Sequence, residues 1–222
     1  MKIGLLVPAN NTTMERELLA WLPAGSSCRT LRVPRGAGLL TQGTVPAYVA
    51  KAIELAGDFS GGDYDAIVYG CTAAGFISGA QADAALANEL SQRAGRPVVT
   101  TARAMVLALQ DCAAKEIAVV TPYLDPVNER LTALLADCGI RVKRLNSFRA
   151  ADVDELGRIP EEEVAALARK TMSEDCDALL IACSQLPTHG IVEGLQREWN
   201  RPVWSSVQAT AWQTLKSTSH LQ

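Results

Sequence analysis

The segment YDAIVYGCT at residues 64–72 reappears as CDALLIACS at residues 176–184, and in each copy a cysteine follows a short apolar run. A run of this length, bounded by turn residues, is typical of a buried strand in a parallel sheet. Ligands of such sheets bind just beyond the carboxyl ends of the strands. We therefore expect Cys71 and Cys183 to face the same crevice.

The repeat continues on both sides of these segments. KIGLLVP at 2–8 is echoed by EIAVVTP at 116–122, and RPVVTT at 96–101 by RPVWSS at 201–206. Helical patterns separate the apolar runs, and alternating strands and helices predict parallel sheets with helices on both faces. The strands are expected near 3–7, 30–33, 66–69, 98–100, 117–120, 142–145, 178–181 and 203–205.

This pattern predicts an α/β fold of two pseudo-symmetric Rossmann-like halves, each a mostly parallel sheet flanked by helices, with the active site in the crevice between them. Residues 1–112 form the half that carries Cys71, and residues 113–222 form the half that carries Cys183. We also consider that the C-terminal helix packs across onto the other half.

Composition and charge exclude several classes of partner. The 222 residues are 48% hydrophobic, which is enough for a packed core. The net charge is −3 and like charges do not cluster into long runs, so neither a nucleic acid nor a membrane is an expected partner. No apolar stretch approaches the roughly 20 residues of a membrane span, and the first residues do not resemble a signal peptide. We expect a cytosolic protein.

Neither a metal nor an organic cofactor is expected. The chain has six cysteines and two histidines but no Cys-x-x-Cys pair, so a zinc site would need an unusual ligand set. Neither Gly-x-Gly-x-x-Gly nor Gly-x-x-x-x-Gly-Lys-Ser/Thr, the glycine-rich motifs that bind nucleotide phosphates, follows an expected strand. The cysteines outside the repeat are interpreted as reduced, inert core residues. They are Cys28, Cys112, Cys138 and Cys176.

Two thiols on opposite sides of a small substrate form an acid and base pair that needs no cofactor. Each thiol can serve one face of a stereocentre. Alternatively, one thiolate adds to an activated double bond, the other thiol protonates the adjacent carbon, and rotation about the new single bond gives the other geometric isomer. A helix N-terminus favours a thiolate, and we expect helices to begin after both Cys71 and Cys183. Burial as a small hydrophobic residue explains either cysteine alone equally well, but their alignment in the repeat favours a working pair.

Several other side chains are candidates for the crevice. Tyr123 follows an expected strand and can donate a hydrogen bond to a carboxylate, or else is a core or interface tyrosine. Asn10 and Asn11 can bind substrate or cap the following helix. His189 is either a surface histidine or a group that tunes the Cys183 thiol. The glycine-rich segment 36–43 is either a mobile loop over the crevice or a long surface connection.

Two motifs resemble a known family. PANNTTME at 8–15, and TPY at 121–123 followed by DPVNERL at 125–131, are similar to segments of the aspartate/glutamate racemase superfamily, in its branch of maleate cis-trans isomerases and arylmalonate decarboxylases. The resemblance covers nearly the whole chain. It implies that Cys71 is a nucleophile forming a succinyl thioether and that Cys183 supplies the proton. It also implies Asn11 and Tyr123 as carboxylate ligands and a homo-oligomer, either a dimer or a larger assembly.

The leading prediction is therefore a cofactor-independent isomerase of a small dicarboxylate, converting maleate to fumarate. Cys71 attacks and Cys183 protonates, while four residues with nearby backbone N–H groups hold the carboxylates. These are Asn11, Thr72, Tyr123 and Ser184.

Three alternatives stay open. The same thiols suit an amino-acid or hydantoin racemase, and Cys183 alone suits an arylmalonate decarboxylase. The decarboxylases have glycine at the position of Cys71. The sequences of residues 74–79 and 152–158, however, resemble the decarboxylases more than the isomerases. The resemblance also implies a second substrate-binding asparagine after the sixth strand, whereas none occurs in 150–159 and Asn146 lies just before. A non-enzymatic alternative is a small-anion sensor that closes around its ligand.

Overall fold

The computed structural model describes residues 1–36 and 38–219 and contains two four-stranded parallel sheets. Their strand orders, β2-β1-β3-β4 and β6-β5-β7-β8, are the same, as the internal repeat predicts. Strands are present at all eight expected places. They are β1 (Lys2–Pro8), β2 (Ser27–Val33), β3 (Ala66–Tyr69), β4 (Val98–Thr100), β5 (Glu116–Thr121), β6 (Arg141–Ser147), β7 (Ala178–Ile181) and β8 (Val203–Ser205).

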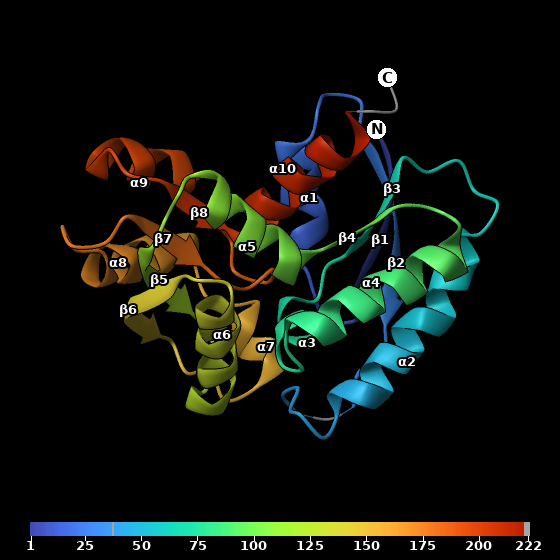
Figure 1. Ribbon diagram of the computed structural model, residues 1–222, viewed down its shortest axis with the longest axis horizontal. Coiled ribbons are helices and arrows are strands. Elements are labelled where there is room, and N and C mark those ends of the chain that lie inside the picture. Colours follow the sequence, from blue (N-terminus) through green and yellow to red (C-terminus); the bar gives the residue numbers. More distant parts are fainter. Residues whose placement is uncertain (37, 220–222) are drawn as a thin grey trace.

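Helices cover both faces of each sheet, which confirms the predicted fold class. Figure 1 shows α5 and α10 between the two sheets, α2 and α4 on the outside of the first half, and α6, α8 and α9 around the second. The helices are α1 (Met14–Trp21), α2 (Val45–Ala56), α3 (Thr72–Phe76), α4 (Ala80–Ala94), α5 (Thr101–Asp111), α6 (Asp125–Asp137), α7 (Val153–Leu156), α8 (Glu161–Thr171), α9 (Val192–Trp199) and α10 (Ser206–Thr218), with a 3₁₀ turn at Gly57–Phe59.

The C-terminal helix α10 completes the core of the first half. Ile3 and Leu5 of β1 belong to an apolar cluster that also contains Val207 and Ala211 of α10. Because side chains alternate along a strand, Leu6 points to the opposite face and joins the larger cluster instead. The α10 helix therefore covers one apolar face of the first sheet together with Met14 and Leu18 of α1.

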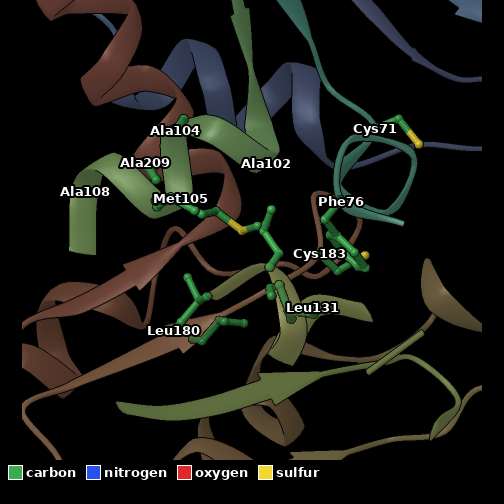
Figure 2. Packing of buried hydrophobic residues seen from close by; sticks show 14 of the residues in the cluster. Cys71, Phe76, Ala102, Ala104, Met105, Ala108, Leu131, Leu180, Cys183 and Ala209 are labelled. Atoms are coloured by element: carbon green, nitrogen blue, oxygen red, sulfur yellow. The ribbon is translucent and has the colours of Figure 1, made fainter. Parts of the chain in front are cut away.

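The α5 and α10 helices pack against each other about a pseudo-twofold axis. Thr101 and Ser206 are equivalent in the repeat, as are Met105 and Thr210 four residues later. The Thr210 hydroxyl donates to Thr101 Oγ1 at 3.1 Å, and the Ser206 hydroxyl donates to Met105 Sδ at 3.0 Å. Figure 2 shows Met105 pointing from α5 into the cluster where the halves meet. This is the pattern of an isologous interface, here within one chain.

The larger apolar cluster contains residues of both sheets and includes Cys71 and Cys183 (Figure 2). The division at residue 112 stays a prediction. It falls between α5 and β5, but the core is continuous across it. Residues 220–222 of the predicted second half lie outside the described residues.

Candidate active site

A cavity lies beyond the carboxyl ends of β1, β3, β5 and β7, with about 590 Å³ of free space counting the part open to solvent. The structure brings all six predicted site residues to its wall. They are Asn11, Cys71, Thr72, Tyr123, Cys183 and Ser184.

Cys71 sits where β3 passes into α3, and it is the N-cap residue of that helix as predicted. Its side chain is buried. The preceding residue, Gly70, lies so close to β1 and α1 that an added Cβ would overlap Met14 Sδ and come within 2.9 Å of Val7 Cγ1. The absence of a side chain at residue 70 therefore lets the backbone bring Cys71 to its place.

Cys183 follows β7 and is also buried. The prediction that a helix begins directly after it is wrong. The chain forms a turn, closed by the Leu186 N–H donating to the Cys183 carbonyl at 3.2 Å, and the next helix, α9, begins at Val192. Pro187 disfavours helical backbone at Leu186 and has no N–H of its own. The Gln185 N–H nevertheless donates to Cys183 Sγ at 3.4 Å.

Burial raises the pKa of both thiols, and several nearby groups act in the opposite direction. Backbone N–H groups and a tyrosine hydroxyl favour each thiolate, with Tyr48 beside Cys71 and Tyr123 beside Cys183. The Arg35 guanidinium favours both. Burial also raises the pKa of both tyrosines. Both phenols thus stay protonated and can donate to a thiolate or a ligand.

Ser184 connects the two halves at the cavity. Its hydroxyl donates to the Gly70 carbonyl at 2.7 Å, and its N–H donates to Thr72 Oγ1 at 3.0 Å. Asn11 Nδ2 donates to Ser184 Oγ at 3.1 Å, while Asn11 Oδ1 accepts two backbone N–H bonds at the start of α1. Asn11 therefore supports the start of α1 from two residues before its N-cap, Thr13, and one N–H of its amide is left for a ligand in the cavity.

Further hydrogen bonds hold the loop after Cys183 against the start of α1. Gln185 Oε1 accepts from the Thr12 N–H at 3.1 Å, and the Gln185 carbonyl accepts from Thr13 Oγ1 at 2.8 Å. The Glu17 carboxylate accepts from both the N–H and the hydroxyl of Thr188, at 2.7 and 2.8 Å. These bonds join residues more than 170 positions apart and fix Cys183 relative to the first half.

The glycine-rich segment 36–43 borders the cavity, since Leu39 and Leu40 line it together with the preceding Arg35. Ala37 lies outside the described residues. Part of this segment thus lies over the crevice as predicted, whereas its mobility stays a prediction.

Other sequence candidates lie elsewhere. His189 is exposed and packs its ring edge-on against Trp21, at 4.8 Å between centroids, in keeping with a surface histidine. Asn146 Nδ2 donates to Thr171 Oγ1 at 3.1 Å and is not part of the cavity wall. Of the four cysteines predicted to be core residues, Cys176 is buried and the other three are half-buried. Within 1–36 and 38–219, no group of three or more His, Cys, Asp and Glu side chains could hold a metal ion, and no helix is long and apolar enough to cross a membrane.

Sequence reasoning missed several residues of the site, Leu124 and Val127 of the apolar wall among them. Arg35, Leu156 and Gln185 line the cavity, and Tyr48 reaches the Cys71 thiol from α2. Arg35 could have been predicted from the sequence, because it is a positively charged residue two positions beyond the end of the β2 strand. Leu156, Gln185 and Tyr48 are ordinary in sequence, and only the packing of α2 and α7 and the turn after Cys183 places them here.

Comparison with known proteins matches residues 3–222 to the family described as arylmalonate decarboxylase. The maleate isomerase of Nocardia farcinica (strain IFM 10152) is 31% identical over 97% of this chain and 89% of its own length. The arylmalonate decarboxylase of Bordetella bronchiseptica is 28% identical over 65% of this chain and 61% of its own.

The fold is also found among solved structures. One is a cysteine-to-serine variant of the Nocardia farcinica maleate cis-trans isomerase with a covalently bound succinylcysteine intermediate. It superposes with a TM-score of 0.88 at 29% identity, over 98% of this chain and 92% of that one. The expected branch of the superfamily is confirmed.

Proposed function

This chain belongs to the arylmalonate decarboxylase family, and we propose that within it the protein is a cysteine-dependent maleate cis-trans isomerase. The observation that carries the proposal is the meeting of two thiols from opposite halves in one cavity. Maleate isomerases align with nearly the whole chain, and one such enzyme forms a succinylcysteine intermediate. A small dicarboxylate with an activated double bond is the substrate class for which this pair is suited.

In the proposed reaction, the Cys71 thiolate adds to one alkene carbon of maleate, and the electron pair of the double bond moves toward the carboxylate of the other carbon. The Cys183 thiol protonates that second carbon and becomes a thiolate. Rotation about the resulting single bond brings the carboxylates to opposite sides. Cys183 then removes a proton from the same carbon, the double bond re-forms, and the Cys71 thiolate leaves with fumarate as the product.

Backbone N–H groups, a tyrosine hydroxyl and Arg35 act on both thiols, and the position of Cys71 at the start of a helix is the difference that supports this division of roles. Cys71 begins α3, where free backbone N–H groups favour a thiolate. Cys183 has the Tyr123 phenol beside it, which can donate to the sulfur once the proton has gone to substrate. Thr72, Ser184 and Asn11 supply further polar groups at the cavity wall, and we assign them to the carboxylates together with Tyr123.

The alternatives predict different products. A racemase would exchange an α-hydrogen, and a decarboxylase would release carbon dioxide without needing Cys71. A sensor that closes its two halves around a ligand would require them to move apart. The buried hydrogen bonds from Ser184 and Thr188 to the first half oppose such movement.

Proton NMR of the reduced protein with maleate tests the proposal directly. The vinyl singlet of maleate should be replaced by that of fumarate, and both Cys71→Ser and Cys183→Ser should abolish the change. Cys112→Ser is the matched control, because Cys112 is half-buried and outside the cavity. An unchanged maleate signal with the wild-type protein would contradict the proposal, and α-deuteration of aspartate, glutamate and hydantoins would then be assayed. The expected homo-oligomer is a separate proposal, checked by light scattering in solution.

A further inference from the structure

The cavity wall carries a positively charged side chain, Arg35, to which the proposed reaction assigns no contact with substrate. Arg35 is the one ionisable side chain other than the thiols and Tyr123 among the described residues that line it. No carboxylate in the described ranges lies within 4 Å of its guanidinium, so its charge has no ion-pair partner there. An unpaired charge at an apolar wall is costly unless a ligand of opposite charge neutralises it.

We propose that Arg35 is the residue that selects a dianionic substrate, by placing its guanidinium against the carboxylate that the neutral donors near the thiols leave unpaired. This inference rests on the proposed function, because it names the charge state of the substrate that the two thiols act on. It predicts that a dicarboxylate is strongly preferred over its monoamide.

The local geometry supports a built position for Arg35. Its side chain is half-buried, and Nη2 donates to the Gly38 carbonyl at 2.9 Å, which fixes one edge of the guanidinium on its own loop. Nε is buried and has no hydrogen-bond partner among the described residues. An arginine with one edge held and a buried donor still free is suited to a carboxylate, which accepts charge-assisted hydrogen bonds in the plane of the guanidinium.

The rest of the cavity divides into two kinds of surface. Thr72, Tyr123 and the remaining amide N–H of Asn11 lie near the thiols and offer neutral donors, whereas Ser184 already donates its N–H to Thr72 and its hydroxyl to the Gly70 carbonyl. Leu39, Leu40, Leu124, Val127 and Leu156 make much of the remaining wall and offer none. If one carboxylate of a dianion uses the neutral donors, the other carboxylate lies against a largely apolar wall. Arg35 is the charged side chain on that wall that can pair with it.

The charge of Arg35 acts on the thiols as well as on a ligand. Burial is the main influence on the pKa of Cys71 and Cys183, and the guanidinium partly opposes it for both. Removal of the cation should therefore slow thiolate chemistry on any substrate, whereas loss of carboxylate pairing should affect only the dianion. The ratio of kcat/KM for the dicarboxylate to kcat/KM for its monoamide separates the effect on the thiols from the effect on carboxylate pairing.

The test compares maleate with maleamate, its monoamide, as substrates for the wild type, Arg35→Gln and Arg35→Lys. We expect Arg35→Gln to lower kcat/KM for maleate by roughly 10- to 100-fold more than for maleamate, as for loss of one charge-assisted hydrogen bond. Arg35→Lys should restore part of the preference. Turnover of maleamate by Arg35→Gln shows that this variant is folded. Arg16→Gln removes an exposed charge that is outside the cavity, and it should leave the ratio unchanged.

Calorimetry with unreactive ligands makes the result independent of turnover. The wild type should bind succinate more tightly than succinamate, and Arg35→Gln should lose that difference. Equal loss of kcat/KM for maleate and maleamate, equal affinity of the wild type for the two unreactive ligands, or no binding of either would overturn the assignment of Arg35. Absence of maleate turnover together with a succinate preference that depends on Arg35 would instead reject the proposed isomerase and leave the assignment in place.

Discussion

Replacing Glu17 should both destabilise the protein and disturb Cys183, because this carboxylate joins α1 to the loop that follows the second thiol. Glu17 is 3% exposed and Thr188 is 1% exposed, so the two bonds between them are shielded from water. A hydrogen bond to a charged group contributes about 1.5–3 kcal/mol, so Glu17→Ala should lower the free energy of unfolding by about 3–5 kcal/mol. Against a total of about 5–15 kcal/mol, this is a large loss.

The gentler Glu17→Gln variant keeps one acceptor oxygen and can donate to the Thr188 hydroxyl, so we expect a loss of about 1 kcal/mol. Urea unfolding of Glu17→Ala, Thr188→Val and the double variant gives the coupling between the two side chains. In the Glu17→Ala background the Thr188 hydroxyl has lost its acceptor, so its removal should cost about 1–2 kcal/mol less than in the wild type.

Glu15→Ala is the control on the same helix, and it should change the free energy of unfolding by less than about 0.5 kcal/mol. Activity should fall with Glu17→Ala even at urea concentrations far below unfolding, because the turn that carries Cys183 is released. Additive effects of Glu17→Ala and Thr188→Val, or unaltered activity in Glu17→Ala, would refute this account of the loop.

Three further predictions follow from burial and close packing. Because burial raises the pKa of Cys71, its alkylation by iodoacetamide in a Cys183→Ser background should accelerate with pH about a midpoint above that of free cysteine; a midpoint below it would be contrary to this account. Burial raises the pKa of Asp83 to about 6, so the folded state holds its proton more tightly than the unfolded state and stability should fall by up to about 3 kcal/mol between pH 4 and 6. Asp83→Asn should remove that fall in urea titrations at several pH values. Gly70→Ala should lower the free energy of unfolding by about 1–3 kcal/mol through overlap with Met14, whereas Gly194→Ala in α9, with open space around it, should raise it by about 0.5–1 kcal/mol; equal thermal shifts would contradict this.

The fold was predictable because the apolar runs repeat with the same spacing in both halves. The buried strands β3 and β7 have the predicted bounds, since every residue in them is apolar. The β2 strand begins three residues before its predicted start, at Ser27. Its first residues are polar or partly exposed, and pairing with β1 from Lys2 onward, rather than burial, makes them a strand. Edge strands of this kind carry little hydrophobic signal.

The six predicted site residues were accessible to sequence reasoning because each lies within four residues of the end of a predicted strand. Residues that reach the site from other elements were not, whether they line the cavity, as Leu156 does, or adjoin the Cys71 thiol, as Tyr48 does. Leu156 comes from the short α7 helix and Tyr48 from α2, and neither position has a pattern that distinguishes it from a core residue. The sequence also predicts a helix after Cys183, whereas Pro187 disfavours helical backbone at Leu186 and the chain forms a turn there.

The internal symmetry explains why the two thiols can have different roles although they occupy equivalent positions. Each half contributes one strand-end cysteine, and the α5 and α10 helices fix the halves face to face, so a ligand in the cavity has one sulfur from each half. The segments after the cysteines have diverged. Thr-Ala-Ala-Gly at 72–75 continues into a helix, whose first N–H groups partly offset the effect of burial on the pKa of Cys71. Ser-Gln-Leu-Pro at 184–187 makes a turn that binds the first half, so Cys183 is held rigidly with a phenol beside it. A nucleophile requires the first environment, and a proton donor that must return to the same carbon requires the second.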